Sequence, residues 1–61
     1  MTLTKGMSVV VAHGVSGWAG IVIATQPGYV TVGYPYGDKP GDQYPTRELI
    51  DLSKHNVRVV A

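Results

Sequence analysis

The sequence predicts an all-β fold made of short strands, and two observations carry that prediction. Short apolar runs dominated by valine and isoleucine alternate with residues typical of turns. The chain also holds eight glycines and four prolines among only 61 residues, with no phenylalanine. A chain of this size forms one domain with a small core. Because it has no cysteine, tight packing or self-association must supply its stability instead of disulfides or thiolate metal sites.

The apolar runs can be followed in order along the chain. They span residues 7–12, 19–25, 28–34, a short and weaker 42–46, then 48–52 and a possible sixth run at 56–60. Pro27 followed by Gly28 is typical of a type II turn, which makes the second and third runs a tight hairpin. Pro40 and Gly41 repeat this pair, which predicts a second hairpin with a longer loop between the third and fourth runs.

The segment "YPTREL" fits a single helical turn, because Thr46 can cap it and Arg47 and Glu48 follow. A longer helix over 46–55 is the alternative, although so short a helix is marginal alone. Five short strands with one helical turn before the last barrel strand describe an SH3-like small barrel, whose closure removes sheet edges. We expect one domain over residues 1–61, with the core barrel at 5–53 and a C-terminal strand or tail at 54–61.

The stretch "HGVSGWAGIV" combines three evenly spaced glycines with the only tryptophan of the chain. We expect Gly14 and Gly17 to supply the positive φ that a tight reversal needs. Gly20 is expected where another strand's backbone approaches closely or where a bulge bends the barrel. Trp18 has two interpretations: it covers one end of the barrel, or it stays partly exposed as a stacking platform.

The segment "KGMSVVVAHGVSGWAGIVIAT" resembles a KOW motif, and the likeness extends over about the first 33 residues. The matching positions are Lys5, Gly6, Val9, Val11, Gly14, Gly17, Gly20 and Val22. The resemblance implies an SH3-like barrel that contacts RNA, protein or both, as in ribosomes and NusG-type transcription factors. The loop of this chain carries only His13 where that family has basic residues, so we expect a protein partner at least as much as RNA.

A second resemblance is to plasmid-borne type II dihydrofolate reductases, which are small SH3-like barrels acting as tetramers around a central pore. The shared layout is glycine-tryptophan-x-glycine, then "GYVTV", then "QYPTRELI". That family's valine-glutamine-isoleucine-tyrosine pore motif is replaced here by Asp42, Gln43, Tyr44 and Pro45. Only Gln43 and Tyr44 are partial matches, and a tetrameric pore-type reductase is the remote alternative function.

Strand alternation assigns two faces to the predicted strands. The inward face is expected to hold Val9, Val11, Val22, Val30 and Val32. The outward face then carries Val10, Ile21 and Ile23, which predicts a subunit or partner interface unless the loop or the C-terminal strand covers it. Val57 and Val59 of the tail could provide that cover within the same chain or in a neighbour, and the tail is also a candidate for strand addition between chains.

The aromatic residues are the second candidate surface. We expect ligand contacts through Trp18, Tyr34, Tyr36 and Tyr44, which could accept a proline-rich segment or stack on bases. The alternative is that the tyrosines stiffen a hairpin and cover the barrel edge. Binding of RNA or DNA would add the basic residues Lys5, Arg47, Lys54 and Arg58, although a net charge of +1 gives no strong field toward phosphate.

Catalysis and metal binding are not expected. Ser8, Ser16 and Ser53 lack a nucleophile motif, and His13 and His55 lack the spacing of metal ligands. The sequence also shows no targeting signal or membrane span, so a cytoplasmic protein is expected. We therefore expect a non-catalytic binding module without a cofactor, which binds a protein partner or itself as a homo-oligomer, with nucleic-acid binding as the alternative.

Overall fold

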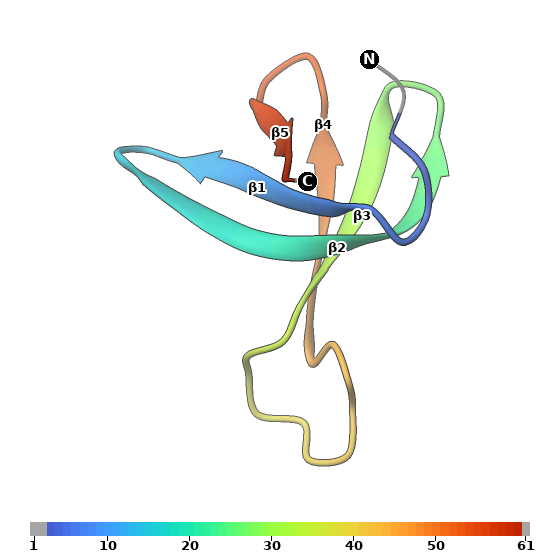
Figure 1. Cartoon of the computed structure of the whole chain (residues 1–61), viewed down its shortest axis with the longest axis vertical. Helices are drawn as coiled ribbons and strands as arrows, with labels where there is room; N and C mark the ends of the chain where they lie inside the picture. Colours follow the sequence, from blue (N-terminus) through green and yellow to red (C-terminus); the bar gives the residue numbers. More distant parts are fainter. Residues whose placement is uncertain (1–2, 61) are drawn as a thin grey trace.

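The computed structural model describes residues 3–60 and confirms the all-β class, with no helix in that part of the chain (Figure 1). Its five strands are β1 (Ser8–His13), β2 (Ser16–Gln26), β3 (Tyr29–Tyr34), β4 (Thr46–Asp51) and β5 (Val57–Val59). They form one antiparallel sheet in the order β4-β3-β2-β1-β5. Among the described residues there is no helix that could cross a membrane.

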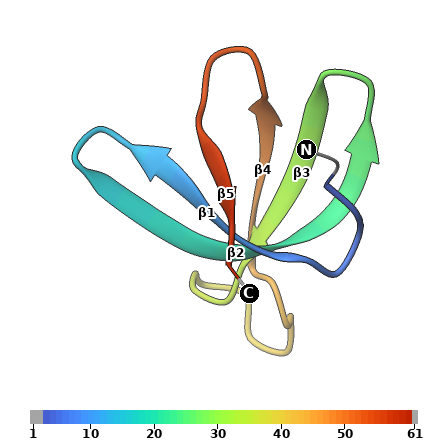
Figure 2. The same ribbon diagram turned by 45° about the horizontal axis from the view of Figure 1, so that its top comes forward.

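The long strand β2 pairs with two neighbouring strands. Its first half, from Ser16 to Ile21, pairs with β1, and its second half, from Ile21 to Gln26, pairs with β3. A bulge between Val22 and Ala24 bends the strand where it changes partner. The β1–β2 hairpin therefore crosses over the β3–β4 pair, and the sheet curls around its core (Figures 1 and 2). The outer strands β4 and β5 are not hydrogen-bonded to each other, so the sheet is not closed.

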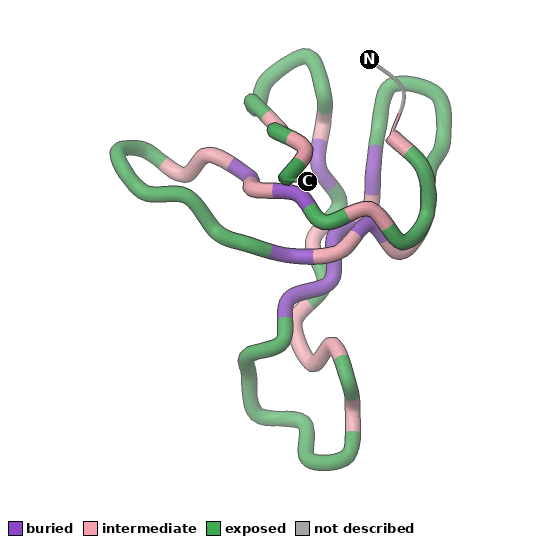
Figure 3. Tube along the Cα trace, in the orientation of Figure 1, coloured by how far each residue is buried: buried purple, intermediate pink, exposed green. Residues whose placement is uncertain are grey.

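The core lies on the concave face of the curled sheet. The five predicted inward valines are each at most 1 % exposed, which confirms the alternation: Val9, Val11, Val22, Val30 and Val32. Tyr34 and Ile50 complete the set of buried apolar side chains, and the buried stretches of the chain lie near the centre of the curled sheet (Figure 3). Leu3, Met7, Val57 and Val59 pack against it from the two ends of the chain.

Two turns behave as the sequence predicts, and one glycine does not. Gly14 has a φ of 60° and Gly28 a φ of 78°, as the β1–β2 and β2–β3 turns require. In the β1–β2 turn Gly14 alone has a positive φ, as in a type II′ hairpin. Gly17 was expected to share that conformation, and this is wrong. It lies within β2, where a Cβ would come within 2.7 Å of Val10 Cγ1.

The prediction of a strand at 42–46 and of a helical turn at Thr46–Glu48 is wrong. Residues 42–45 belong to the β3–β4 loop, where Asp42 Oδ1 accepts a hydrogen bond from the Tyr44 amide and Pro45 has no amide to donate. Residues from Thr46 onward instead pair with β3 through to Asp51. Pairing along the whole of β3 stabilises this segment more than an isolated helical turn would. A single turn does precede the last strand, where the amides of Lys54 and His55 bond to the Asp51 carbonyl.

The C-terminal run forms β5, which pairs with β1 of its own chain. Val10 lies opposite Arg58, and the Val60 amide donates to the Ser8 carbonyl at 2.8 Å. Because Val57 and Val59 pack against the core, these two side chains do not cover the outward aliphatic residues of β2. The edge strand is therefore supplied within one chain.

Candidate functional site

An apolar groove of about 470 Å³ lies on the outer face of β1 and β2. One wall comes from Val10, Ala19 and Ile21, which alternation directs away from the core. The other wall comes from three residues of the β3–β4 loop, Pro35, Gln43 and Tyr44, and Val60 after β5 also lines the groove. The sequence predicted Val10 and Ile21 as an interface and Tyr44 as a ligand contact. The structure brings all three together in one groove.

The pairing of β1 with β2 explains why the strand wall is continuous. Val10 lies opposite Ala19 and Ser8 lies opposite Ile21, so side chains from the two strands share the same face. Val10 and Ile21 are each half-buried. Ile23, the third predicted interface residue, is at the bulge and packs beside the groove, over Gly33. A Cβ on Gly33 would clash with Ile23 Cδ1 and lie 2.9 Å from Tyr44 Cβ. Because Gly33 has no side chain, the β3–β4 loop can lie directly against the sheet at this position.

Three hydrogen bonds hold the loop wall in place. The Tyr36 hydroxyl donates to the Ala19 carbonyl at 2.9 Å, which ties the start of the loop to β2. The Thr46 hydroxyl donates to the Tyr36 carbonyl at 2.6 Å, which joins the two ends of the loop. Arg47 Nε donates to the Tyr44 carbonyl at 3.3 Å, and its guanidinium lies 3.5 Å from Asp42. These contacts fix the position of Tyr44 against the sheet.

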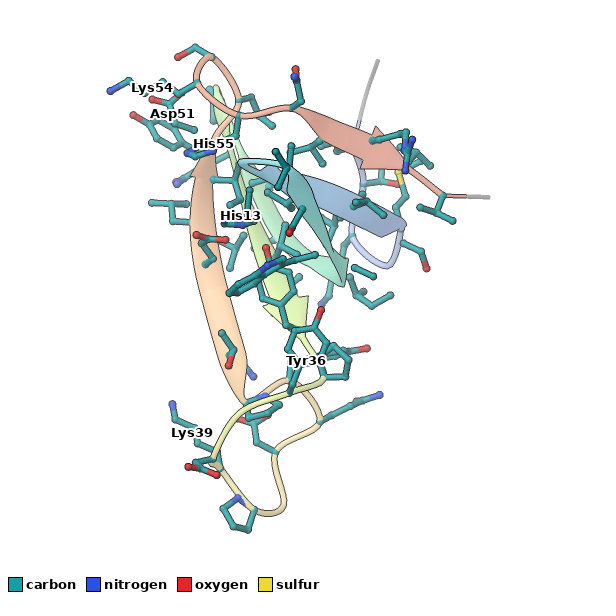
Figure 4. All side chains as sticks on the ribbon, turned by 90° about the vertical axis from the view of Figure 1, so that its left-hand side faces the viewer. His13, Tyr36, Lys39, Asp51, Lys54 and His55 are labelled. Carbon is teal, nitrogen blue, oxygen red and sulfur yellow. The ribbon has the colours of Figure 1, made fainter. Side chains whose placement is uncertain are left out.

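A second candidate surface lies at one end of the concave face, where His13, Trp18, Tyr34 and Tyr36 form an aromatic cluster. Figure 4 labels two of its members, His13 and Tyr36. Trp18 stacks on His13 with ring centroids 4.6 Å apart, and it meets the Tyr34 ring edge-on at 5.5 Å. Tyr36 stacks on Tyr34 at 5.8 Å. Trp18 is 42 % exposed, so it covers the end of the core and also presents an accessible ring. Partial exposure agrees with the second interpretation of this residue, and its role as a stacking platform stays a prediction.

The prediction of Tyr34 as a ligand contact is wrong. Its side chain is fully buried, because it continues the inward alternation of Val30 and Val32. Its hydroxyl donates to Glu48 Oε1 at 2.9 Å. Burial raises the pKa of Tyr34 above its ordinary value of 10.0, and the hydrogen bond and negative charge of Glu48 raise it further. Tyr34 is therefore the buried member of the aromatic cluster, and Trp18 and Tyr36 pack against its ring.

The polar residues of this cluster were not predicted. His13 Nε2 lies 3.3 Å from Glu48 Oε1, yet this buried nitrogen makes no hydrogen bond among the described residues. The His55 ring lies 6.3 Å from that of His13. Alternation could have placed His13 in line with Val9 and Val11, but only the pairing of β3 with β4 brings Glu48 beside it. No group of three potential ligands in residues 3–60 could hold a metal ion.

The basic residues of the nucleic-acid alternative are spread over four parts of the chain. They are Lys5 before β1, Arg47 at the start of β4, Lys54 in the turn beyond its end, and Arg58 on β5 at the opposite edge of the sheet. Acidic residues accompany two of them, since Asp42 lies beside Arg47 and Asp51 beside Lys54. Hydrogen bonds from Ser53 lower the pKa of Asp51, and Lys54 lowers it further. Figure 4 shows Lys39 and Lys54 at opposite ends of the molecule.

Comparison of the chain with protein-family models, with curated proteins and with solved structures found no match.

Proposed function

We propose that the protein is a non-catalytic binding module of the SH3-like small-barrel class that associates with protein through its outer groove. The occupant that we propose is a second copy of the same chain. The class is supported by the meander of β1 to β4, by the return of β5 to the side of β1, and by the sharing of β2 between two halves of the sheet.

The observation that carries the proposal is the apolar character of the groove. Its polar side chains are Ser8, Gln43 and Tyr44, and none of its lining residues carries a charge. Tyr44 is half-buried, and depletion of charge together with a tyrosine is typical of the centre of a protein interface. A phosphate backbone would require lysine or arginine at this place, so the groove favours a protein partner over RNA or DNA.

The size of the molecule agrees with a dimer interface on this face. The described chain exposes 4231 Å² and measures 33 by 25 by 21 Å. A standard interface buries about 800 Å² per partner, which is about a fifth of that surface. One broad face of so small a molecule provides this area, and the groove lies on the outer face of β1 and β2. Val60, which lines the groove and is 44 % exposed, would add to the contact.

Light scattering over a concentration series tests the proposal. We expect the wild-type chain to show at least a dimer mass, and Ile21→Asp to remain folded but become monomeric, because a carboxylate cannot be buried unpaired at the interface. Leu49→Asp is the matched control, since Leu49 is 56 % exposed on β4 and lies outside the groove. Its mass should equal that of the wild type.

Salt separates the protein-binding proposal from the nucleic-acid alternative. Self-association through apolar side chains should persist or strengthen as salt rises, whereas phosphate contacts weaken steeply. A wild-type monomer up to millimolar concentration, or an Ile21→Asp variant with unchanged mass, would contradict self-association through this groove. A tetramer would make folate binding the next measurement, because Gln43 and Tyr44 line the groove.

A further inference from the structure

We propose that the aromatic cluster and Glu48 together bind the guanidinium group of an arginine side chain from a partner protein. This site is separate from the outer groove and does not depend on it. It lies at the end of the concave face, where His13 comes from β1, Trp18 from β2, Tyr34 from β3 and Glu48 from β4. Tyr36 adds a second exposed ring from the start of the β3–β4 loop (Figure 4).

The two exposed rings are held rigidly before a ligand arrives. Trp18 is 42 % and Tyr36 is 48 % exposed, and their planes meet at 80° with centroids 6.5 Å apart. His13 backs Trp18, Tyr34 backs Tyr36, and the Tyr36 hydroxyl is bonded to the Ala19 carbonyl. Rings that are already ordered lose little entropy on binding. Their accessible surface suits a planar cation, which aromatic rings attract.

Glu48 supplies a negative charge without a permanent counter-charge. Its side chain is 38 % exposed, and its ion-pairing neighbour in residues 3–60 is His13, which is charged only when protonated. Oε1 accepts the Tyr34 hydrogen bond, while Oε2 accepts none from the described residues. Glu48 and Trp18 share two neighbours, because both contact His13 and Tyr34, and the carboxylate and the exposed ring therefore belong to one cluster.

A guanidinium group satisfies both halves of this site at once. It can stack on an aromatic face while it donates hydrogen bonds to a carboxylate, and it sheds water more easily than an ammonium group does. The lysine ammonium is a compact, strongly hydrated charge that matches a flat site less well. The carboxylate of Glu48 would repel a phosphate at the same place, which separates this site from nucleic-acid stacking.

Nuclear magnetic resonance of the wild-type protein provides the first test. The chain has one tryptophan, so a single indole N–H resonance reports on Trp18. We expect this resonance to shift saturably when acetyl-Gly-Arg-Gly-amide is added, with a dissociation constant in the millimolar range. The citrulline peptide has the same shape without the charge and should bind about fivefold more weakly. Equal shifts and affinities for the two peptides, or no shift with arginine, would overturn the proposal.

A pair of variants tests the role of the carboxylate. Glu48→Gln keeps an oxygen that can accept the Tyr34 hydrogen bond but removes the charge, and it should lower the affinity for the arginine peptide about fivefold. Asp51→Asn is the matched control on the same strand, because that carboxylate is already held by Ser53. Unchanged affinity in Glu48→Gln would contradict the proposal. The citrulline comparison uses the wild-type chain, so it tests the proposal even if Glu48→Gln does not fold.

The groove variant distinguishes the two proposals. Ile21→Asp should lose self-association and retain arginine binding, since Ile21 lies on the opposite face of β2 from Trp18. Self-association without arginine binding would overturn only the inference about the aromatic cluster. Arginine binding by a wild-type monomer would overturn only the proposed assembly.

Discussion

Replacement of Gly20 by alanine tests how closely β3 approaches β2. A Cβ at residue 20 would lie 2.6 Å from Val32 Cγ1, 2.7 Å from the Gly33 carbonyl oxygen and 3.0 Å from Tyr34 Cδ1. The Gly33 carbonyl is backbone and cannot rotate away, and Val32 and Tyr34 are fully buried. Strand pairing between β2 and β3 must therefore shift to admit a methyl group.

The cost can be estimated from these contacts. Overpacking of a well-packed core costs roughly 1 to 3 kcal/mol, and three simultaneous overlaps place Gly20→Ala near the upper end. Alanine recovers about 0.4 to 1 kcal/mol by restricting the unfolded chain, which leaves a net loss of about 2 kcal/mol. For a domain of this size each kcal/mol lowers the Tm by about 4 to 8 °C, so the Tm should fall by roughly 8 to 16 °C. Gly20→Val adds two more methyl groups and should unfold the domain.

Thermal unfolding followed by circular dichroism provides the measurement, with Gly17→Ala as the control. A Cβ on Gly17 would meet Val10 Cγ1 at 2.7 Å, but that methyl belongs to a half-exposed side chain that can rotate. Gly17→Ala should therefore lose less than about 1 kcal/mol. Equal melting of Gly20→Ala and the wild type, or equal losses at both positions, would refute the close approach of backbone at residue 20.

The remaining predictions concern a buried hydroxyl and a turn. Because the folded chain raises the pKa of Tyr34, the unfolded chain loses this proton first, and stability should fall as the pH rises above about 10. Tyr34→Phe should reduce this alkaline loss and cost about 1 kcal/mol at neutral pH. Urea titrations of both proteins at pH 7 and pH 10.5 measure the loss of unfolding free energy between the two pH values. An equal loss in the wild type and in Tyr34→Phe would contradict the assignment. Gly28→Ala meets no atom within 4 Å but must adopt a φ of 78°, so its cost of about 1 kcal/mol is backbone strain alone, measured by the shift in urea midpoint.

The inner face of the sheet was predictable from the sequence. Val9 and Val11 lie two residues apart on one strand, and Val30 and Val32 lie on either side of the polar Thr31 on another. The pleat directs each pair to a single face, which is the core face. The same rule applied to Tyr34 would have placed it in the core, but the tyrosine-rich loop that follows suggested a binding residue instead. The turns at Gly14 and Gly28 were equally predictable, because a tight turn at each place needs a residue with positive φ.

The candidate sites were predicted only as separate residues. Val10 and Ile21 follow from alternation, but their meeting with Tyr44 depends on the path of the β3–β4 loop. That path is set by the hydrogen bond between Tyr36 and the Ala19 carbonyl, which joins residues 17 positions apart. Glu48 entered the aromatic cluster because β4 pairs with β3, whereas the local sequence around Thr46 resembled a helical turn.

The sequence by itself determined which residues of each strand face the core and where the chain turns. These properties depend on the pleat of one strand and on the φ angles of a few glycines and prolines, and both are local. Only the tertiary structure decided the partner of β3, the position of the last strand beside β1, and the residues that meet in the groove and around Glu48. Those outcomes depend on contacts between residues far apart in the chain, whose free energy is gained only when the whole sheet has formed.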